Sequence, residues 1–242
     1  MTYPTKKLDN EGKVWRYMSL SKFIWLMKEK KLWMSRSDTL GDAWELTLAG
    51  KQLERVVQTH PINYIGKTGL TENAIDRSQR IIKNWRHQTF VNCWSLNNNE
   101  SHALWQIYCG TNEGVSIQTT RMRLANSLVQ HPSILLEKVI YQEAGSIEKT
   151  PTIQNLITSK RLMFEFEQEI RLYQTLEEGN SENLTGVGLF WNPCEHIESI
   201  YIHPDADSFF RDVVVDIVKN FAPSLLPNIQ WSAMKDKPPL ID

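Results

Sequence analysis

The stretch Val14 to Met27, VWRYMSLSKFIWLM, contains the change of pattern that decides the fold. Val14 to Met18 is short, aromatic and β-branched, which is typical of a strand. Apolar residues then recur at the i, i+3, i+4, i+7 spacing of a helix face, at Leu20, Phe23, Ile24 and Met27. Ser19 or Ser21 can cap the start of that helix. A strand that runs directly into a helix predicts a protein that mixes both elements.

The rest of the chain continues this mixture. Further strands are predicted at Leu32 to Ser35, Phe90 to Ser95, Gly114 to Gln118, Ile134 to Tyr141, Phe164 to Tyr173, Ile197 to Ile202 and around Ile229. Helices are predicted at Glu45 to Val57, Asn73 to Arg86, Glu100 to Cys109, Ile153 to Met163 and Asp207 to Phe221. Connections are predicted at Ser37 to Asp42, Gly66 to Gly69 and Glu177 to Gly186. Because the short strands do not alternate strictly with helices, we expect an α+β fold: a mixed, largely antiparallel sheet flanked by helices.

Length and composition favour one globular domain. The chain has 242 residues, of which 41% are hydrophobic, and it shows no internal repeat or long linker. We therefore expect a single domain over residues 1–242, with a helical insertion at about 43–87.

Charge and cysteine content narrow the classes of partner. Lysine plus arginine (27) nearly cancels aspartate plus glutamate (28), so no global field attracts a polyanion or an anionic membrane. No apolar run is long enough to span a membrane, and residues 1–10 lack the apolar stretch of a signal peptide. The three cysteines are widely spaced and are expected to be reduced thiols in a cytoplasmic protein without a membrane partner.

The segment Phe164 to Tyr173, FEFEQEIRLY, carries the polar pattern most suggestive of chemistry. As a strand it places its apolar residues mainly on one face and Glu167, Glu169, Arg171 and Tyr173 on the other. Two carboxylates followed by an arginine can orient a sugar hydroxyl or bind a metal ion. The alternative interpretation is an exposed strand face with cross-strand ion pairs.

Five ordered motifs resemble the domain of unknown function 2971 family, which is bacterial and uncharacterised. They are Trp15-Arg16-Tyr17, Leu32 to Ser35 followed by Asp38 to Glu45, Cys93-Trp94-Ser95, Leu104 to Tyr108 with Gly114, and Glu167 to Arg171. The chain departs from the family pattern at Gly41-Asp42-Ala43, where the family has an Asn-Asp-Pro-like turn. The resemblance implies a cytoplasmic α+β domain and no settled reaction.

The order of several polar residues is also similar to that of ADP-ribosyltransferases, which implies NAD as co-substrate and a protein or nucleic-acid acceptor. Those enzymes carry a first-strand arginine or histidine, a middle serine or tyrosine, and a late Glu-x-Glu around NAD. In that resemblance Glu169 holds the ribose, Glu167 orients or deprotonates the acceptor, and Arg16 meets the pyrophosphate. Trp94 or Tyr17 stacks on the nicotinamide.

Two other functions stay open at this point. Five carboxylates are candidates to converge on Mg²⁺ or Mn²⁺ in a metal-dependent nuclease: Asp38, Asp42, Glu45, Glu167 and Glu169. The other function is that of a non-catalytic module, in which tryptophans and the arginines Arg16, Arg36 and Arg171 bind a nucleotide or single-stranded RNA. The six histidines have no zinc-ligand spacing, so no metal ligands are assigned.

All these interpretations lead to one expectation about the site. Ten side chains are expected to gather in a single polar cleft: Arg16, Tyr17, Ser35, Asp38, Trp94, Ser95, Trp105, Glu167, Glu169 and Arg171. The oligomeric state is not predicted by any of these patterns.

Overall fold

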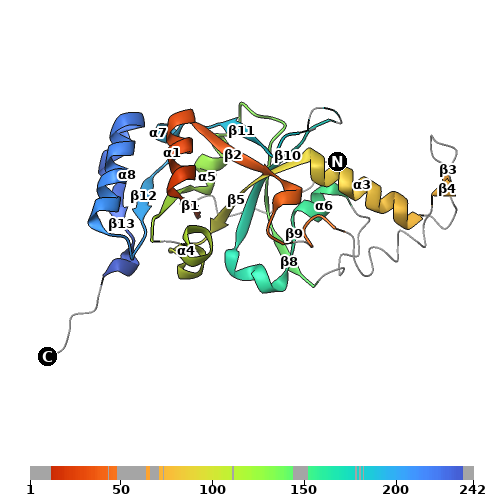
Figure 1. The fold of residues 1–242 in the computed structure, drawn as a ribbon, viewed down its shortest axis with the longest axis horizontal. Coiled ribbons are helices and arrows are strands. Elements are labelled where there is room, and N and C mark those ends of the chain that lie inside the picture. Colours follow the sequence, from red (N-terminus) through yellow and green to blue (C-terminus); the bar gives the residue numbers. More distant parts are fainter. Residues whose placement is uncertain are drawn as a thin grey trace. The chain divides into compact units, whose positions relative to one another are not determined.

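The structure is a computed structural model, drawn in Figure 1. It describes residues 12–42, 44–47, 64–65, 71–72, 74–110, 112–143, 152–177, 179, 181 and 183–236. No helix among these residues is long and apolar enough to cross a membrane.

The described residues form a nine-stranded, largely antiparallel sheet with helices beside it, together with two separate two-stranded pairings. This confirms the predicted α+β fold with a mixed sheet. By contact the chain divides into two compact units. Unit 1 comprises residues 1–33, 93–132 and 188–242, and unit 2 comprises residues 34–92 and 133–187. The expectation of one domain over residues 1–242 stays a prediction.

Unit 1 is built around its first strand, β1 (Lys13–Ser19). β1 pairs antiparallel with β6 (Gly114–Thr120) along its whole length and with the end of β5 (Thr89–Leu96). On the far side of β6, β12 (Ser199–Ile202) pairs antiparallel, and β13 (Ile229–Trp231) then pairs parallel with β12. Every residue of β6 except the last is buried, so the middle of this sheet is a core strand.

Helices cover the sheet of unit 1. The predicted helix after the first strand is α1 (Leu20–Glu29), and it buries its apolar stripe as expected. It packs against α8 (Ser208–Phe221), and the two helices lie side by side in Figure 1. α4 (His102–Cys109) begins at Ser101, whose hydroxyl accepts a hydrogen bond from the Leu104 amide. Short helices complete the unit: α5 (Arg121–Asn126), α7 (Pro193–His196), η3 (Pro223–Asn228) and η4 (Ala233–Lys235).

Unit 2 is also built on antiparallel strands. β2 (Lys31–Arg36) pairs with β5 through Ser35 and Arg36, and β10 (Glu169–Thr175) pairs with β5 and with β7 (Leu135–Lys138). The long helix of this unit is α3 (Ala74–Gln88), as predicted. The remaining elements are η1 (Ser37–Thr39), β3 (Tyr64–Ile65), β4 (Thr71–Glu72), β8 (Ile140–Gln142), α6 (Ile153–Ile157), β9 (Ser159–Arg161) and η2 (Leu162–Glu167).

Three predicted elements of unit 2 differ from the structure. The strand predicted over Phe164 to Tyr173 begins only at Glu169, because its first part is the 3-10 helix η2. The helix predicted over Ile153 to Met163 ends at Ile157, and the chain then forms β9. A strand that was not predicted, β11 (Gly186–Phe190), begins at Gly186, where the predicted connection from Glu177 ends.

Two other predictions concern residues that the structure describes only in part. The helix predicted over Glu45 to Val57 begins in a described turn at 44–46, and the rest of it lies outside the described residues. The connection predicted at Gly66 to Gly69 also lies outside them.

Candidate functional site

The interior of unit 2 contains a cluster of charged side chains, which we call the charged cluster: Glu45, Lys160, Glu167, Glu169 and Arg171. Lys160 is at its centre, with its Nζ 2.6 Å from Glu167 Oε2, 3.3 Å from Glu45 Oε1 and 3.5 Å from Glu169 Oε2. None of these side chains is more than 7% exposed. The interpretation of Glu167 and Glu169 as part of an exposed strand face is therefore wrong.

Arg171 is the second cation of the charged cluster, and it is fully buried. Its guanidinium donates to Glu45 Oε1 at 2.7 Å and to Glu169 Oε2 at 2.7 and 3.2 Å. Its Nη1 donates to the Ile157 carbonyl at 2.7 Å. These bonds fix the guanidinium, which in turn fixes the carboxylate of Glu169.

The backbone between Glu167 and Glu169 explains how both carboxylates enter the charged cluster. Gln168 adopts a left-handed conformation with φ of 44° at the end of η2, and β10 begins at the next residue. The amide of Glu169 donates to the Tyr141 hydroxyl at 2.7 Å. Glu167 therefore comes from a helix end and not from the same strand face as Glu169 and Arg171, which corrects the predicted ladder.

The carboxylates of Glu45, Glu167 and Glu169 face the cations Lys160 and Arg171 in this cluster. Burial would lower the pKa of Lys160, but the three carboxylates together raise it above its ordinary value. Burial also raises the pKa of Glu167, although Lys160 opposes this change. One carboxylate oxygen, Glu45 Oε2, is buried and has no hydrogen-bond partner in the part of the chain that the structure describes.

A partly exposed aromatic and cationic group lies beside the charged cluster in unit 2. Arg161, the residue after Lys160, donates to both oxygens of Asp42 at 2.8 and 3.1 Å. Its guanidinium is 5.4 Å from the centre of the Phe164 ring and 5.9 Å from that of Trp44. The ammonium of Lys160 is 4.8 Å from the centre of the same Phe164 ring. Since Trp44 is 50% exposed, this group links the buried charges to the protein surface.

The other predicted site residues of unit 2 are at the ends of paired strands. Ser35 faces Val91 in the pairing of β2 with β5. Asp38, in η1, accepts hydrogen bonds from Arg36 Nε at 2.7 Å and Nη2 at 3.1 Å. Burial by itself would raise the pKa of Asp38, but the bonds and charge of Arg36 outweigh burial and lower it. Asp38 is therefore held as an ionised partner of Arg36.

Arg16 and Ser95 occupy unit 1 and contact the backbone or polar groups near β5. Arg16 Nη1 donates to the Cys93 carbonyl at 2.7 Å, and burial lowers the pKa of its guanidinium. Ser95 Oγ accepts from Asn97 Nδ2 at 2.7 Å. The role of Arg16 at a pyrophosphate stays a prediction.

The aromatic candidates of unit 1 belong to its core. The Tyr17 hydroxyl accepts from the Ser101 amide at 2.8 Å, and its ring meets that of Trp105 edge-on at 5.0 Å. Trp105 Nε1 donates to Glu100 Oε2 at 3.0 Å, and Trp94, only 2% exposed, packs against Trp191 at 5.9 Å. The two contacts of Tyr17 position α4 against β1, and stacking of Trp94 or Tyr17 on nicotinamide stays a prediction.

The ten predicted residues divide equally between the units. Unit 1 contains Arg16, Tyr17, Trp94, Ser95 and Trp105, and unit 2 contains Ser35, Asp38, Glu167, Glu169 and Arg171. The structure brings Glu167, Glu169 and Arg171 together. Their gathering with the other seven in one cleft stays a prediction.

Comparison with known proteins gives a structural likeness only. No protein-family model matches the sequence, and no curated protein matches it. The resemblance to the domain of unknown function 2971 family therefore stays a prediction.

Three solved structures of Thermus sp. 2.9 DarT are similar to the chain, in complex with carba-NAD+, with ADP-ribosylated ssDNA and with NAD+. Their identities are 8%, 10% and 11%, and their TM-scores are 0.45, 0.41 and 0.39. The matches cover 94% of this chain and 98% of the other in the first case, and 96% and 98% in the other two. A likeness at these values does not extend to function.

Several residues of the unit 2 site were not singled out from the sequence. Lys160, Arg161, Phe164 and Tyr141 each contact the charged cluster or its aromatic neighbours, and they come from segments whose type was predicted wrongly or only in part. One signal was present: the basic pair Lys160-Arg161 stands just before the acidic run.

The convergence expected for a metal-dependent nuclease is partly present. Glu45, Glu167 and Glu169 approach one another, but the cation among them is the ammonium of Lys160. Among the described residues no group of three or more histidine, cysteine, aspartate or glutamate side chains is arranged to hold a metal ion.

Proposed function

We propose that the chain is an NAD-dependent ADP-ribosyltransferase-like enzyme in which Glu169 holds the ribose. One observation carries this proposal: the carboxylate of Glu169 is buried and Arg171 holds it with two hydrogen bonds. The carboxylates of Glu45 and Glu167 lie in the same cluster, in an interior of low dielectric constant.

Such a site fits the chemistry of breaking the nicotinamide–ribose bond. The transition state of that reaction resembles an oxocarbenium ion, so positive charge develops on the sugar. A carboxylate that is already desolvated and fixed stabilises this charge without reorganising during the reaction. Glu169 meets this requirement because Arg171 holds it with two hydrogen bonds.

Glu167 is proposed to orient or deprotonate the acceptor. A general base works best when its pKa is close to the working pH, and burial raises the pKa of this carboxyl above its ordinary value. The acceptor, a protein or a nucleic acid, is not specified by the charged cluster.

Glu45 adds a further hydrogen-bond acceptor. Its buried Oε2 has no partner within the described ranges, and buried polar atoms in folded proteins are nearly always paired. A ribose hydroxyl is a donor of the right kind for this oxygen. The half-exposed Trp44 and the nearby Phe164 then offer an aromatic wall for the nicotinamide or adenine ring.

The test is to incubate the purified protein with labelled NAD and cell extract and to measure nicotinamide release and label transfer. Glu169→Gln keeps the size of the side chain and removes its charge, so turnover is expected to fall by about 100-fold or more. The matched control is Glu165→Gln, which changes an exposed carboxylate in the same 3-10 helix that carries Glu167. Thermal unfolding of both variants shows whether a loss of turnover reflects a loss of fold.

A nucleotide-binding module without turnover is the second candidate. The burial of Glu169, which is 4% exposed, favours it, because a substrate must reach a catalytic carboxylate. Wild-type protein that binds NAD but releases no nicotinamide would support this module and reject the transferase. Turnover that is equal in Glu169→Gln and the wild type would reject the role of Glu169.

A further inference from the structure

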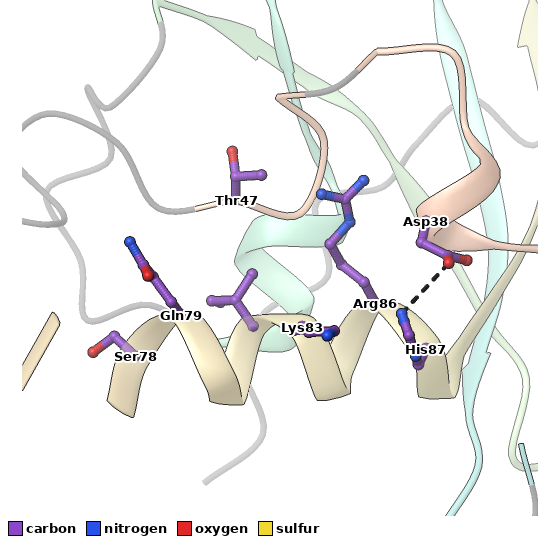
Figure 2. A pocket seen from close by; sticks show the side chains of 8 residues that line it. Asp38, Thr47, Ser78, Gln79, Lys83, Arg86 and His87 are labelled. Carbon is purple, nitrogen blue, oxygen red and sulfur yellow. Dashed lines mark ion pairs between the residues drawn. The ribbon is translucent and has the colours of Figure 1, made fainter. Parts of the chain in front are cut away.

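Unit 2 also contains a cavity that is not part of the charged cluster. Its volume is about 490 Å³, and Figure 2 shows α3 along one side and the segments of Asp38 and Thr47 along the other. The lining side chains are Asp38, Thr47, Ser78, Gln79, Ile82, Lys83, Arg86 and His87. A volume of this size is in the range of small-molecule sites.

The helix wall of the cavity is polar and basic for a simple geometric reason. Residues three and four apart lie on one face of a helix, so Gln79, Lys83 and Arg86 share a face. Ile82, 8% exposed, gives this wall an apolar part. A ligand here would meet cations, hydrogen-bonding groups and a small apolar surface.

Within the described ranges, the cations of the wall are not balanced by carboxylates. Asp38 is the acidic side chain of the lining, and Arg36 already binds it at 2.7 Å. His87 Nε2 is 3.6 Å from the same carboxylate, the pair drawn as a dashed line in Figure 2. No carboxylate of the described residues forms an ion pair with Lys83 or Arg86, so these two charges are available to an anion.

Arg86 places a buried hydrogen-bond donor in this wall. Its Nε is buried, and it has no hydrogen-bond partner in the described part of the chain. Figure 2 shows its side chain rising from α3 toward the segment of Thr47. Because a buried donor without an acceptor is rare in folded proteins, this atom indicates an acceptor from a ligand.

We infer that this cavity binds a phosphoryl group, with Arg86 and Lys83 as its cationic ligands. The planar guanidinium of arginine forms two parallel hydrogen bonds to a phosphoryl group, and the ammonium of lysine adds a point charge. Thr47, Ser78 and Gln79 line the same cavity and supply polar contacts to the rest of the ligand. This inference stands on the cavity alone and does not depend on the proposed transferase activity.

The test is isothermal titration calorimetry of the full chain with inorganic pyrophosphate and, separately, with ADP. Arg86→Gln and Lys83→Gln are each expected to weaken both affinities by about tenfold or more, because each removes a charged hydrogen bond. Arg80→Gln is the matched control, since Arg80 is an exposed cation of the same helix that does not line the cavity. It is expected to leave the affinities unchanged.

The two probes distinguish the source of the phosphoryl group. Tighter binding of ADP than of pyrophosphate assigns the site to a nucleotide, whereas equal affinities assign it to phosphate alone. Lys83 is exposed, so Lys83→Gln leaves the packing of α3 intact even if Arg86→Gln unfolds the protein. Absence of binding of both probes to the wild type, or equal affinity in the wild type and Lys83→Gln, would overturn the inference. NAD turnover is measured in parallel, so failure here is separate from failure of the transferase proposal.

Discussion

The interiors of the two units are stabilised by different chemistry. In unit 1 one buried cluster contains the aromatic rings of Trp15, Tyr17 and Trp105, and their polar atoms bind neighbouring groups one at a time, as Trp105 binds Glu100. In unit 2 five charged groups share one buried network around Lys160 and Arg171. A cluster of aromatic rings tolerates a change of pH, whereas a buried network of charges does not. A function that requires an electrostatic field is therefore expected in unit 2.

The largest expected effect comes from removing the central cation of the charged cluster. Lys160→Met leaves three buried carboxylates with one cation, and the free energy of unfolding should fall by about 3–5 kcal/mol. Urea unfolding of the variant and the wild type at pH 7 measures this difference in the free energy of unfolding. The double variant Lys160→Met with Glu167→Gln should recover part of the loss because it removes one of the unpaired charges. Equal stability of the Lys160→Met variant and the wild type would show that the network contributes nothing.

The corresponding change in unit 1 is Phe23→Ala, which removes a fully buried ring of α1 from the apolar core. It should lower the free energy of unfolding by about 3–5 kcal/mol, through lost contacts and a cavity. Measurement at pH 7 and again at pH 5 separates the two units. Lower pH should reduce the cost of Lys160→Met as carboxylates take up protons, and it should leave the cost of Phe23→Ala unchanged. The same pH dependence for both variants would contradict the comparison.

A smaller effect is expected where a strand touches a helix in unit 1. A Cβ added to Gly114 would be 2.2 Å from the Cys109 Cβ and 2.4 Å from its Sγ, which is too close for any packing. Gly114→Ala should therefore destabilise the protein by about 1–3 kcal/mol. Gly41→Ala is the control, because a Cβ there meets no atom within 4 Å. Equal melting temperatures for the two variants would contradict this account of the contact.

The smallest expected effect is the pH dependence of one core histidine. Burial lowers the pKa of His203, so the folded protein binds a proton there less readily than the unfolded chain does. As the pH drops below the ordinary histidine pKa of 6.5, the unfolded chain takes up a proton at His203 before the folded protein does. The free energy of unfolding is therefore expected to fall in that pH range. In the folded protein His203 Nδ1 accepts a hydrogen bond from the Asp205 amide, and His203→Asn keeps an acceptor for that amide. A smaller loss of melting temperature between pH 7 and pH 5 in this variant than in the wild type is the expected result.

Local pattern predicted most of unit 1 and less of unit 2. The first strand and helix follow from a short aromatic and β-branched segment next to a clear helical stripe, and both were found where expected. The segment around Glu167 misled the prediction because its apolar residues alternate as in a strand, yet a left-handed Gln168 divides it. A single left-handed residue outside glycine leaves no trace in hydrophobic periodicity.

The site was predictable only in its acidic half. Glu167, Glu169 and Arg171 are close in sequence, so a local pattern revealed them. Lys160 is only seven positions from Glu167, but it was predicted to lie in a helix and is found in β9. Glu45 joins them by tertiary pairing, 126 positions from the Arg171 that binds it, and local spacing gives no sign of that contact.

The division of unit 1 into three chain segments has a consequence for synthesis on the ribosome. β1 is made first, but its partner β6 and then β12 and β13 follow only after much of unit 2 has been made. The two segments of unit 2 are complete before the last segment of unit 1 emerges. The nascent chain therefore carries an unpaired, aromatic first strand until β5 and β6 have been made, and an open edge of β6 until β12 follows, which makes early engagement by a chaperone an advantage for this topology.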